Sequence, residues 1–258
     1  MTNMETEILK ESDNTVNDNK AETENQEEKM KPLEEMYKAG VHFGYTRSRK
    51  DPRMGAYVFG LKNNNEIFDL EIVQSCLEKA CEFLKNTASM GGKVLFVGTK
   101  AEARNIIEEV AKELNMPYAN LRWIGGTLTN FKTMKTQMAK LEDYLAKKKS
   151  GALGKLIKKE AIRMEKEFSR MNRKFSGILS LKDLPMAIIV LDSKQEETAV
   201  LEAKKINIPV VAILNSDSDP TLIDYPIPAN DASESSIKYV LGKLAEACKT
   251  GAAIPTNN

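Results

Sequence analysis

Three short aliphatic runs constrain the fold of this chain more than any other feature of its sequence. They are KVLFVG at 93–98, MAIIVLD at 186–192 and IPVVAIL at 208–214. Strands that are apolar on both faces belong to parallel sheets covered by helices on each side. Helical segments alternate with these runs, at 101–114, 195–206 and 232–247. Together with a short strand at Pro117 and Tyr118, the pattern predicts an open, doubly wound α/β sheet of about five parallel strands.

Two further apolar series interrupt this alternation between residues 122 and 175. The first is Phe131, Met134, Met138, Leu141 and Leu145, and the second is Ile157, Ala161, Met164, Phe168, Met171 and Phe175. Spacings that alternate between 3 and 4 residues are typical of a coiled-coil seam. Because the polar, glycine-containing segment 146–155 joins the two series, they are predicted to form an inserted antiparallel coiled-coil helical hairpin with one dry seam.

The residues before the first aliphatic run are predicted to form a short helix, a loop and a strand hairpin. Pro32 can begin the helix and Gly40 can end it. The segment 41–55 combines glycine and proline with four cations against one aspartate, so it is interpreted as a basic loop. Two short apolar strands flank the turn at Asn63-Asn64-Asn65, and Asp69 can cap the long helix that follows.

The charge of the chain is divided sharply along its length, although the formal net charge is only +1. Residues 1–30 hold nine acidic and three basic side chains and few large apolar ones, which predicts a disordered acidic tail. Residues 122–174 hold 15 basic and five acidic side chains, a local net charge of +10. Such an excess is typical of a surface that binds a polyanion. A protein-binding coiled coil with solvated lysines would explain the heptads but not this charge.

These patterns divide the chain into four parts. We expect a disordered tail at 1–30, an α/β domain formed by 31–121 and 176–248, a helical hairpin insertion at 122–175, and a flexible C-terminal tail at 249–258.

Several classes of protein are not expected from this composition. No apolar run approaches the roughly 18 residues that a membrane helix needs. The acidic N-terminus is unlike an organelle transit peptide, so the cytoplasm is the expected location. Cys76, Cys81 and Cys248 lack the spacing of a zinc site or of a disulfide framework, so no metal and no cofactor is expected.

A doubly wound sheet is a common scaffold for nucleotide and phosphoryl chemistry. The chain has no P-loop, and VGTKAEAR at 97–104 lacks the second and third glycines of a dinucleotide-binding fingerprint. The alternative is an aspartate-nucleophile phosphatase, because Asp217, Asp219 and Thr221 imitate a D-x-D-x-T motif. Two residues separate that motif from the strand, and only 37 residues follow it, too few for the further strands of such an enzyme. The chain is therefore not expected to be an enzyme.

Three stretches of sequence point to a known family. They are AGVHFGY with TRSRKDPRM and YVFG, GGKVLFVGTK with MPYANLRWIGGTLTNFKT, and DPTLIDYPIPAND. Together they resemble the bacterial ribosomal S-two family over about residues 33–248, and RWIGGTLTNFKT at 122–133 is the most specific piece. The resemblance implies a flavodoxin-like domain with a protruding helical hairpin, a structural component of the small (30S) ribosomal subunit that binds 16S ribosomal RNA. It also implies neighbouring ribosomal proteins as partners, including the large S-one protein, with no membrane and no small-molecule substrate.

Three groups of residues form the candidate RNA-binding site. The basic loop and the hairpin supply cations, which are Arg47, Arg49, Lys50, Arg53, Lys132, Lys135, Lys140, Lys158 and Lys159. Arg122 and Trp123 suit phosphate and stacking contacts. Short donors at a helix N-terminus, where anions bind well, are Thr127, Thr129 and Asn130. The alternative for this motif is that Trp123 belongs to the core and that Gly125-Gly126 merely turns the chain.

The sequence departs from the family at one place, because Tyr45 stands where the family commonly has a second histidine. His42 is therefore the only histidine, and no metal role is expected for that pair of positions. A single histidine between Val41 and Phe43 is more often a hydrogen-bonded structural residue than a ligand.

Overall fold

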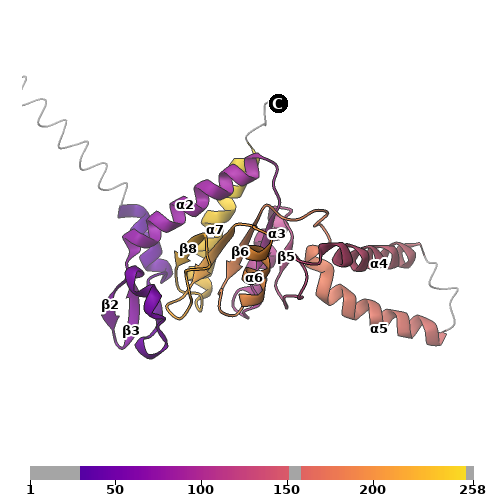
Figure 1. Ribbon diagram of the computed structural model, residues 1–258, viewed down its shortest axis with the longest axis horizontal. Helices are drawn as coiled ribbons and strands as arrows, with labels where there is room; N and C mark the ends of the chain where they lie inside the picture. Colours follow the sequence, from indigo (N-terminus) through magenta and orange to yellow (C-terminus); the bar gives the residue numbers. More distant parts are fainter. Residues whose placement is uncertain (1–29, 151–157, 254–258) are drawn as a thin grey trace, which may run out of the picture.

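The computed structural model describes residues 30–150 and 158–253, and it contains two separate sheets (Figure 1). The larger sheet is parallel, with the strand order β5-β4-β6-β7-β8. Its strands are β4 (Val94–Val97), β5 (Tyr118–Ala119), β6 (Ala187–Leu191), β7 (Val210–Leu214) and β8 (Tyr225–Pro228). Counted along the chain, the order is 2-1-3-4-5, which is that of flavodoxin-like doubly wound folds. The predicted fold class is therefore confirmed.

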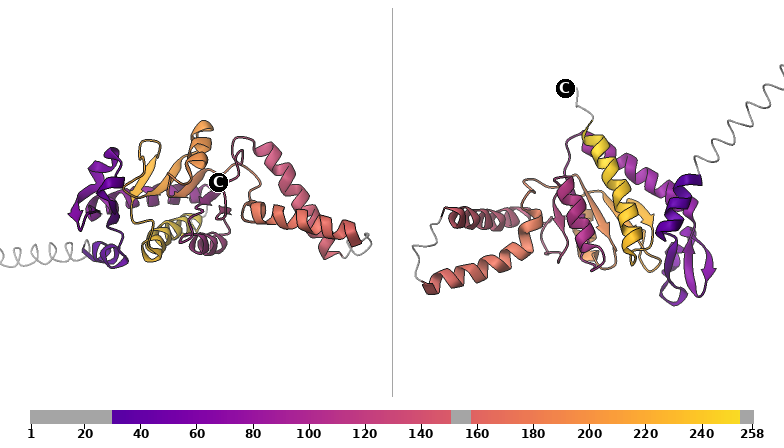
Figure 2. Two further views of the ribbon diagram at one scale, coloured as in Figure 1. Left: turned by 90° about the horizontal axis from the view of Figure 1, so that it is seen from below. Right: turned by 180° about the vertical axis from the view of Figure 1, so that it is seen from behind.

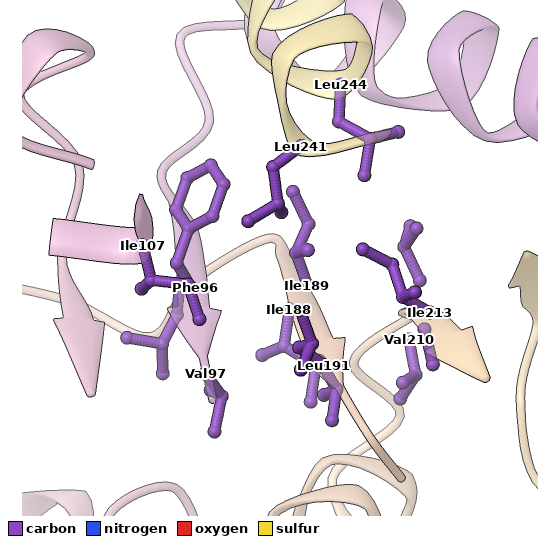
Figure 3. Close-up of a cluster of buried hydrophobic side chains, with 14 of the residues drawn as sticks. Phe96, Val97, Ile107, Ile188, Ile189, Leu191, Val210, Ile213, Leu241 and Leu244 are labelled. Carbon is purple, nitrogen blue, oxygen red and sulfur yellow. The ribbon is translucent and has the colours of Figure 1, made fainter. Parts of the chain in front are cut away.

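Helices cover both faces of the parallel sheet (Figure 2). They are α2 (Leu70–Ser89), α3 (Arg104–Glu113), α6 (Glu197–Lys205) and α7 (Glu234–Ala252). Helices α3 and α7 lie on one face, α6 lies on the other, and α2 packs along α7 and β8. Leu241 and Leu244 of α7 lie over the side chains of β4, β6 and β7, including Phe96, Ile189 and Ile213 (Figure 3). All five side chains are buried, so the aliphatic runs form the core as predicted.

Strand β8 lacks the aliphatic pattern that predicted its neighbours, because two of its four residues are Pro226 and Pro228. Proline has no backbone N–H to donate, so within sheets it is confined to edge strands, strand starts and bulges. β8 is an edge strand, and Tyr225 at its start stacks on Phe83 of α2 with 4.4 Å between ring centroids. The position at the edge explains why a sequence with two prolines still joins the sheet.

The smaller sheet lies at the N-terminal end of the described chain, after a helix over residues 30–39. It is antiparallel with the order β1-β3-β2. Its elements are β1 (Phe43–Thr46), the 3-10 helices η1 (Arg47–Arg49) and η2 (Pro52–Tyr57), β2 (Val58–Lys62) and β3 (Asn65–Phe68). The loop predicted at 41–55 is therefore partly wrong, because its first residues pair with β3. The hairpin is confirmed, and Asn63 and Asn64 have the positive φ values of 52° and 66° that its two-residue turn requires.

The smaller sheet contacts the parallel sheet through β1. The backbone N–H of Tyr45 donates to the Asn215 side chain at 3.1 Å and to Ser216 Oγ at 2.9 Å, just beyond the end of β7. A Cβ at Gly44 would lie 3.2 Å from Ser216 Oγ and 3.1 Å from the backbone oxygen of Glu66. A larger residue at position 44 would push its neighbours apart by a few tenths of an ångström, because β1 approaches the end of β7 so closely.

Helix α7 continues to Ala252, so the domain boundary predicted at residue 248 falls inside a helix. Lys249 Nζ lies 2.6 Å from Glu113 Oε1 of α3, and the buried Gly251 packs against the backbone of Lys85 in α2. Residues 249–252 therefore belong to the α/β domain rather than to the flexible tail predicted at 249–258. Residues 254–258, and residues 1–29 of the predicted acidic tail, lie outside the described residues.

The insertion forms two helices, α4 (Phe131–Lys149) and α5 (Lys158–Phe175), which we call the arm. Figure 1 shows the arm projecting from one end of the parallel sheet, opposite the smaller sheet. Four of the predicted seam residues are buried, namely Met134, Met138, Leu141 and Phe175.

Farther along the arm, the predicted coiled-coil packing is not confirmed. The ring of Tyr144 on α4 stacks on Phe168 of α5 with 4.2 Å between centroids. Beside this contact an open cleft of about 240 Å³ lies between the helices, lined by Leu141, Met164 and Met171 among others. Ile157 and the side chain of Ala161, which the seam also included, lie outside the described residues.

Candidate RNA interface

One face of α5 carries four cations in a row. They are Arg163, Lys166, Arg170 and Arg173, at spacings of 3, 4 and 3 residues. These spacings place side chains on a single face of a helix, over about 15 Å at 1.5 Å per residue. All four side chains are exposed, and the ion pairs found within the described part of the arm do not include them. We call this row the α5 cationic face.

The α5 cationic face was not among the site residues predicted from the sequence. Its signal was present, because Met164, Phe168 and Met171 of the seam leave these four positions on the other side of the helix. The predicted Lys158 and Lys159 lie in the first turn of α5, and their side chains are outside the described residues.

The three predicted cations of α4 differ in their contacts with the rest of the protein. Lys132 and Lys140 are exposed. Lys135 Nζ lies 3.0 Å from Asp183 Oδ1 and over the ring of Phe131, so this cation is partly occupied by contacts within the protein. Asn130, just before α4, is exposed and accepts a hydrogen bond from Thr133 Oγ1 at 2.8 Å.

The basic loop holds most of its cations in ion pairs with the body, by which we mean the two sheets and the helices that cover them. The pairs are Arg49 with Asp217 (3.4 Å), Lys50 with Glu66 (3.4 Å), and Arg53 with both Asp51 (2.9 Å) and Asp219. The Arg49 guanidinium also lies 4.3 Å from the centroid of the Tyr45 ring. Arg47 is exposed and forms no ion pair with the residues that the structure places. The loop is therefore tied to the body by three of the four cations that were predicted to bind RNA.

In the RWIGGTLTN motif, the side chains of Trp123, Thr127 and Thr129 form contacts within the protein. Trp123 is buried, and its indole N–H donates to Glu202 Oε1 at 3.0 Å, so the prediction of a stacking contact to RNA is wrong and the core alternative holds. Thr127 is also buried, and its hydroxyl donates to the Ile124 carbonyl at 2.6 Å. The hydroxyl of Thr129 donates to Glu202 Oε2 at 3.1 Å. Arg122 is exposed, beside a polar hollow of about 390 Å³.

An anion does occupy the site predicted in this motif, but it is the protein's own carboxylate. Glu202 of α6 accepts from the backbone N–H groups of Gly126 (2.8 Å), Leu128 (3.1 Å) and Thr129 (3.2 Å). Burial of the Glu202 carboxylate would raise its pKa. The hydrogen bonds from Gly126, Trp123, Thr129 and Leu128 outweigh burial and hold the pKa below the ordinary value of 4.5.

This shift predicts a pH dependence of stability. A carboxylate whose pKa is lowered on folding stabilises the folded state above its unfolded pKa, and that contribution is lost as the pH falls through the folded value. Replacing Glu202 by glutamine leaves buried donors unsatisfied, so we expect a loss of about 1–3 kcal/mol at neutral pH. Urea unfolding of both proteins from pH 7 to pH 3 measures the difference, which should be constant at neutral pH and shrink below pH 4.5. A difference that does not change with pH would contradict this account.

A buried charge network lies at the carboxyl ends of the parallel strands. Lys100 Nζ lies 2.8 Å from Asp231 Oδ2, 3.5 Å from Asp192 Oδ2 and 2.8 Å from the Tyr45 hydroxyl oxygen. Burial opposes the charge on Lys100, but the contacts with Asp231 and Tyr45 raise its pKa above the ordinary value. Burial and the neighbouring Asp231 raise the pKa of Asp192. Because Tyr45 belongs to β1, the network connects the smaller sheet to the parallel sheet.

The aspartates of the D-x-D-x-T motif are held in ion pairs and in the hydrogen bonds of a turn. The Asp217 carboxylate is nearly buried and is paired with Arg49 at 3.4 Å and with Lys194 at 3.2 Å. Asp219 accepts from the backbone and the hydroxyl of Thr221 at 2.9 and 2.7 Å, which makes it part of the turn. Both aspartates are thus used in local structure.

His42 is buried, and its ring stacks on Tyr37 with 4.6 Å between centroids. Within the described chain its Nδ1 has no hydrogen-bond partner, so the predicted hydrogen bond is not found at that atom. Burial, with a smaller effect of Lys62, lowers the pKa of His42 below 6.5.

Residues 30–150 and 158–253 lack two further features. None of their helices is long and apolar enough to span a membrane. They also contain no group of three or more histidine, cysteine, aspartate or glutamate residues that could hold a metal ion.

The architecture defines a doubly wound α/β protein with a basic two-helix arm. The sequence model of the family described as ribosomal protein S2 matches residues 36–251. The chain belongs to this family.

Three relatives are similar to the chain over four fifths or more of their own length. It is 41% identical to the small ribosomal subunit protein uS2 of Sorangium cellulosum over 86% of this chain and 80% of the relative. It is 41% identical to the protein uS2c of Cyanophora paradoxa over 88% of this chain and 97% of the relative. It is 42% identical to the uS2 protein of Coprothermobacter proteolyticus over 85% and 82% respectively.

Proposed function

We propose that this chain is a structural component of the small ribosomal subunit and that it binds 16S ribosomal RNA through its arm. The observation that carries the proposal is the α5 cationic face, which lies on a projecting helix in a segment of net charge +10. Arginine and lysine side chains of this kind neutralise phosphates and release their counterions. Membership of the ribosomal protein S2 family and the names of the relatives support the same function.

The proposed interface combines the α5 cationic face with six of the cations predicted from the sequence. The latter are Arg47, Arg122, Lys132, Lys140, Lys158 and Lys159, with Asn130 as a neutral donor. The ion pairs of Arg49, Lys50, Arg53 and Lys135 must be broken or shared before these side chains can meet phosphate. Arginine is well suited to this role because its planar guanidinium can form two parallel hydrogen bonds with one phosphate.

We infer further partners and a location from the same assignment. Neighbouring small-subunit proteins, including the large S-one protein, are proposed as partners, and the cytoplasm is the proposed location. No catalytic role is proposed, because the carboxylates at the strand ends are paired with Lys100, Lys194 and Arg49.

Binding to purified 16S ribosomal RNA and to small subunits tests the proposal directly. A protein with about six phosphate contacts is expected to lose about 10³-fold in affinity between roughly 50 and 200 mM salt. Co-sedimentation of the tagged full chain, with bound protein measured across that range, gives the slope. Binding that does not change with salt, or binding to a ribosomal protein but not to RNA, would overturn the proposed role of the arm.

A further inference from the structure

The loop that leads into the arm is built around one side chain of the body. Five donors of the loop converge on the Glu202 carboxylate, with donor to acceptor distances between 2.8 and 3.2 Å. Oε1 accepts from the Trp123 indole and from the Gly126 N–H, and Oε2 accepts from Leu128 and Thr129. Glu202 itself lies in α6, on the face of the parallel sheet opposite α3 and α7. The carboxylate therefore joins the body to the segment directly before α4.

The local backbone is shaped to hold this carboxylate. Gly126 has a φ of 88°, a conformation that residues with a Cβ rarely adopt, and it allows successive N–H groups to point at one site. Trp123 and Leu128 anchor the loop because their side chains are buried in the core. The first residue of α4, Phe131, follows only two residues after Thr129. The direction in which α4 begins is thus fixed by the residues that hold Glu202.

Few other polar contacts near the base of the arm could replace this one. Lys135 pairs with Asp183 at 3.0 Å, but the Asp183 side chain is 89% exposed. Exposed ion pairs contribute little because water competes with them. Hydrogen bonds to a charged acceptor that is shielded from water are among the strongest in proteins.

We propose that Glu202 is a positioning residue that fixes the direction of the arm relative to the body. This positioning role does not depend on the proposed RNA-binding function, whereas its effect on RNA affinity does. If the carboxylate is removed, the five donors are left without an acceptor, and a small carboxylate such as formate can take its place.

The direction of the arm can be measured without RNA. Nitroxide labels are placed at two exposed positions, Ser169 on α5 and Glu109 on α3, in a full chain whose Cys76, Cys81 and Cys248 are replaced by alanine. Pulsed electron paramagnetic resonance gives the distribution of distances between the two labels. Glu202→Ala should broaden this distribution, and sodium formate should narrow it again while sodium chloride at the same concentration should not.

Two variants serve as controls. Glu197→Ala removes an exposed carboxylate from the first turn of the same helix and changes the net charge equally, so its distribution should match that of the unchanged protein. Glu202→Gln keeps the volume of the side chain if the alanine variant folds poorly. Its distribution should broaden less, and formate should not narrow it because the amide fills the site.

RNA affinity then separates this inference from the function on which it partly rests. If the binding-competent direction falls to about a tenth of the population, affinity for 16S ribosomal RNA falls about tenfold. The salt dependence should stay unchanged, because no phosphate contact is lost. A broadened distribution with unchanged RNA affinity would uphold the positioning role and overturn RNA binding by the arm. A distribution as narrow as that of the unchanged protein in both Glu202 variants would overturn the positioning role.

Discussion

Replacing Arg163, Lys166 and Arg170 together by glutamine is expected to reduce the salt dependence of binding to 16S ribosomal RNA by about 2 to 3 units of logarithmic slope. Each phosphate neutralised contributes about 0.7 to 0.9 to that slope. All three side chains are exposed on one face of α5 and are not used in the ion pairs of the described arm. Glutamine has a helix propensity close to that of arginine and lysine, so α5 should persist. Filter binding at several salt concentrations measures the slope.

A matched control changes the same net charge elsewhere. Lys79 and Lys85 of α2 and Lys238 of α7 are exposed on the body, away from the arm. Their replacement by glutamine should leave the slope close to that of the unchanged protein. If both triple variants flatten the slope equally, the protein meets RNA through its general charge, and the arm has no special part in binding.

Replacing Lys100 by methionine is expected to reduce the free energy of unfolding by about 3–5 kcal/mol, the largest single effect that the structure predicts. Lys100 lies between the carboxylates of Asp231 and Asp192, and the Asp231 side chain is only 1% exposed. Removing the cation leaves two nearby carboxylates without a compensating charge in a site with little access to water. The contact with the Tyr45 hydroxyl is lost as well, which weakens the attachment of the smaller sheet.

Urea unfolding monitored by circular dichroism gives the free energies. Lys204→Met is the control, because Lys204 and Asp224 form a 2.7 Å ion pair whose side chains are both about one third exposed. Such a pair contributes less than about 1 kcal/mol. Equal losses for the two variants would show that the network around Lys100 has no special stability.

The parallel core could be predicted because its signal is local. Each of the runs that became β4, β6 and β7 is apolar at every position, and the shortness of these runs and their β-branched residues favour a buried strand over a helix. β8 could not be predicted in this way, since its two prolines are compatible with a sheet only at an edge. The end of α7 was placed too early, because the contact of Gly251 with Lys85 joins residues far apart in sequence and leaves no local signal.

In the candidate site too, features set by neighbouring residues could be predicted, whereas contacts between residues far apart in sequence could not. The loop before α4 was predicted to hold an anion, and the structure places a carboxylate of the protein there, which contacts Thr129 but not the Thr127 or Asn130 side chains. Its occupant lies more than seventy residues away in sequence, so no local pattern could identify Glu202. The ion pairs of Arg49 with Asp217 and of Arg53 with Asp219 join residues still farther apart, by 168 and 166 positions. The α5 cationic face, in contrast, repeats at helical spacing and was detectable.

The two edge strands of the parallel sheet affect how the protein behaves before it is assembled with its partners. β5 has only two residues, and β8 carries two prolines and lies against α2. A border with few free N–H and C=O groups offers little for a strand of another molecule to pair with. The parallel sheets of two newly made copies therefore have a low tendency to pair edge to edge.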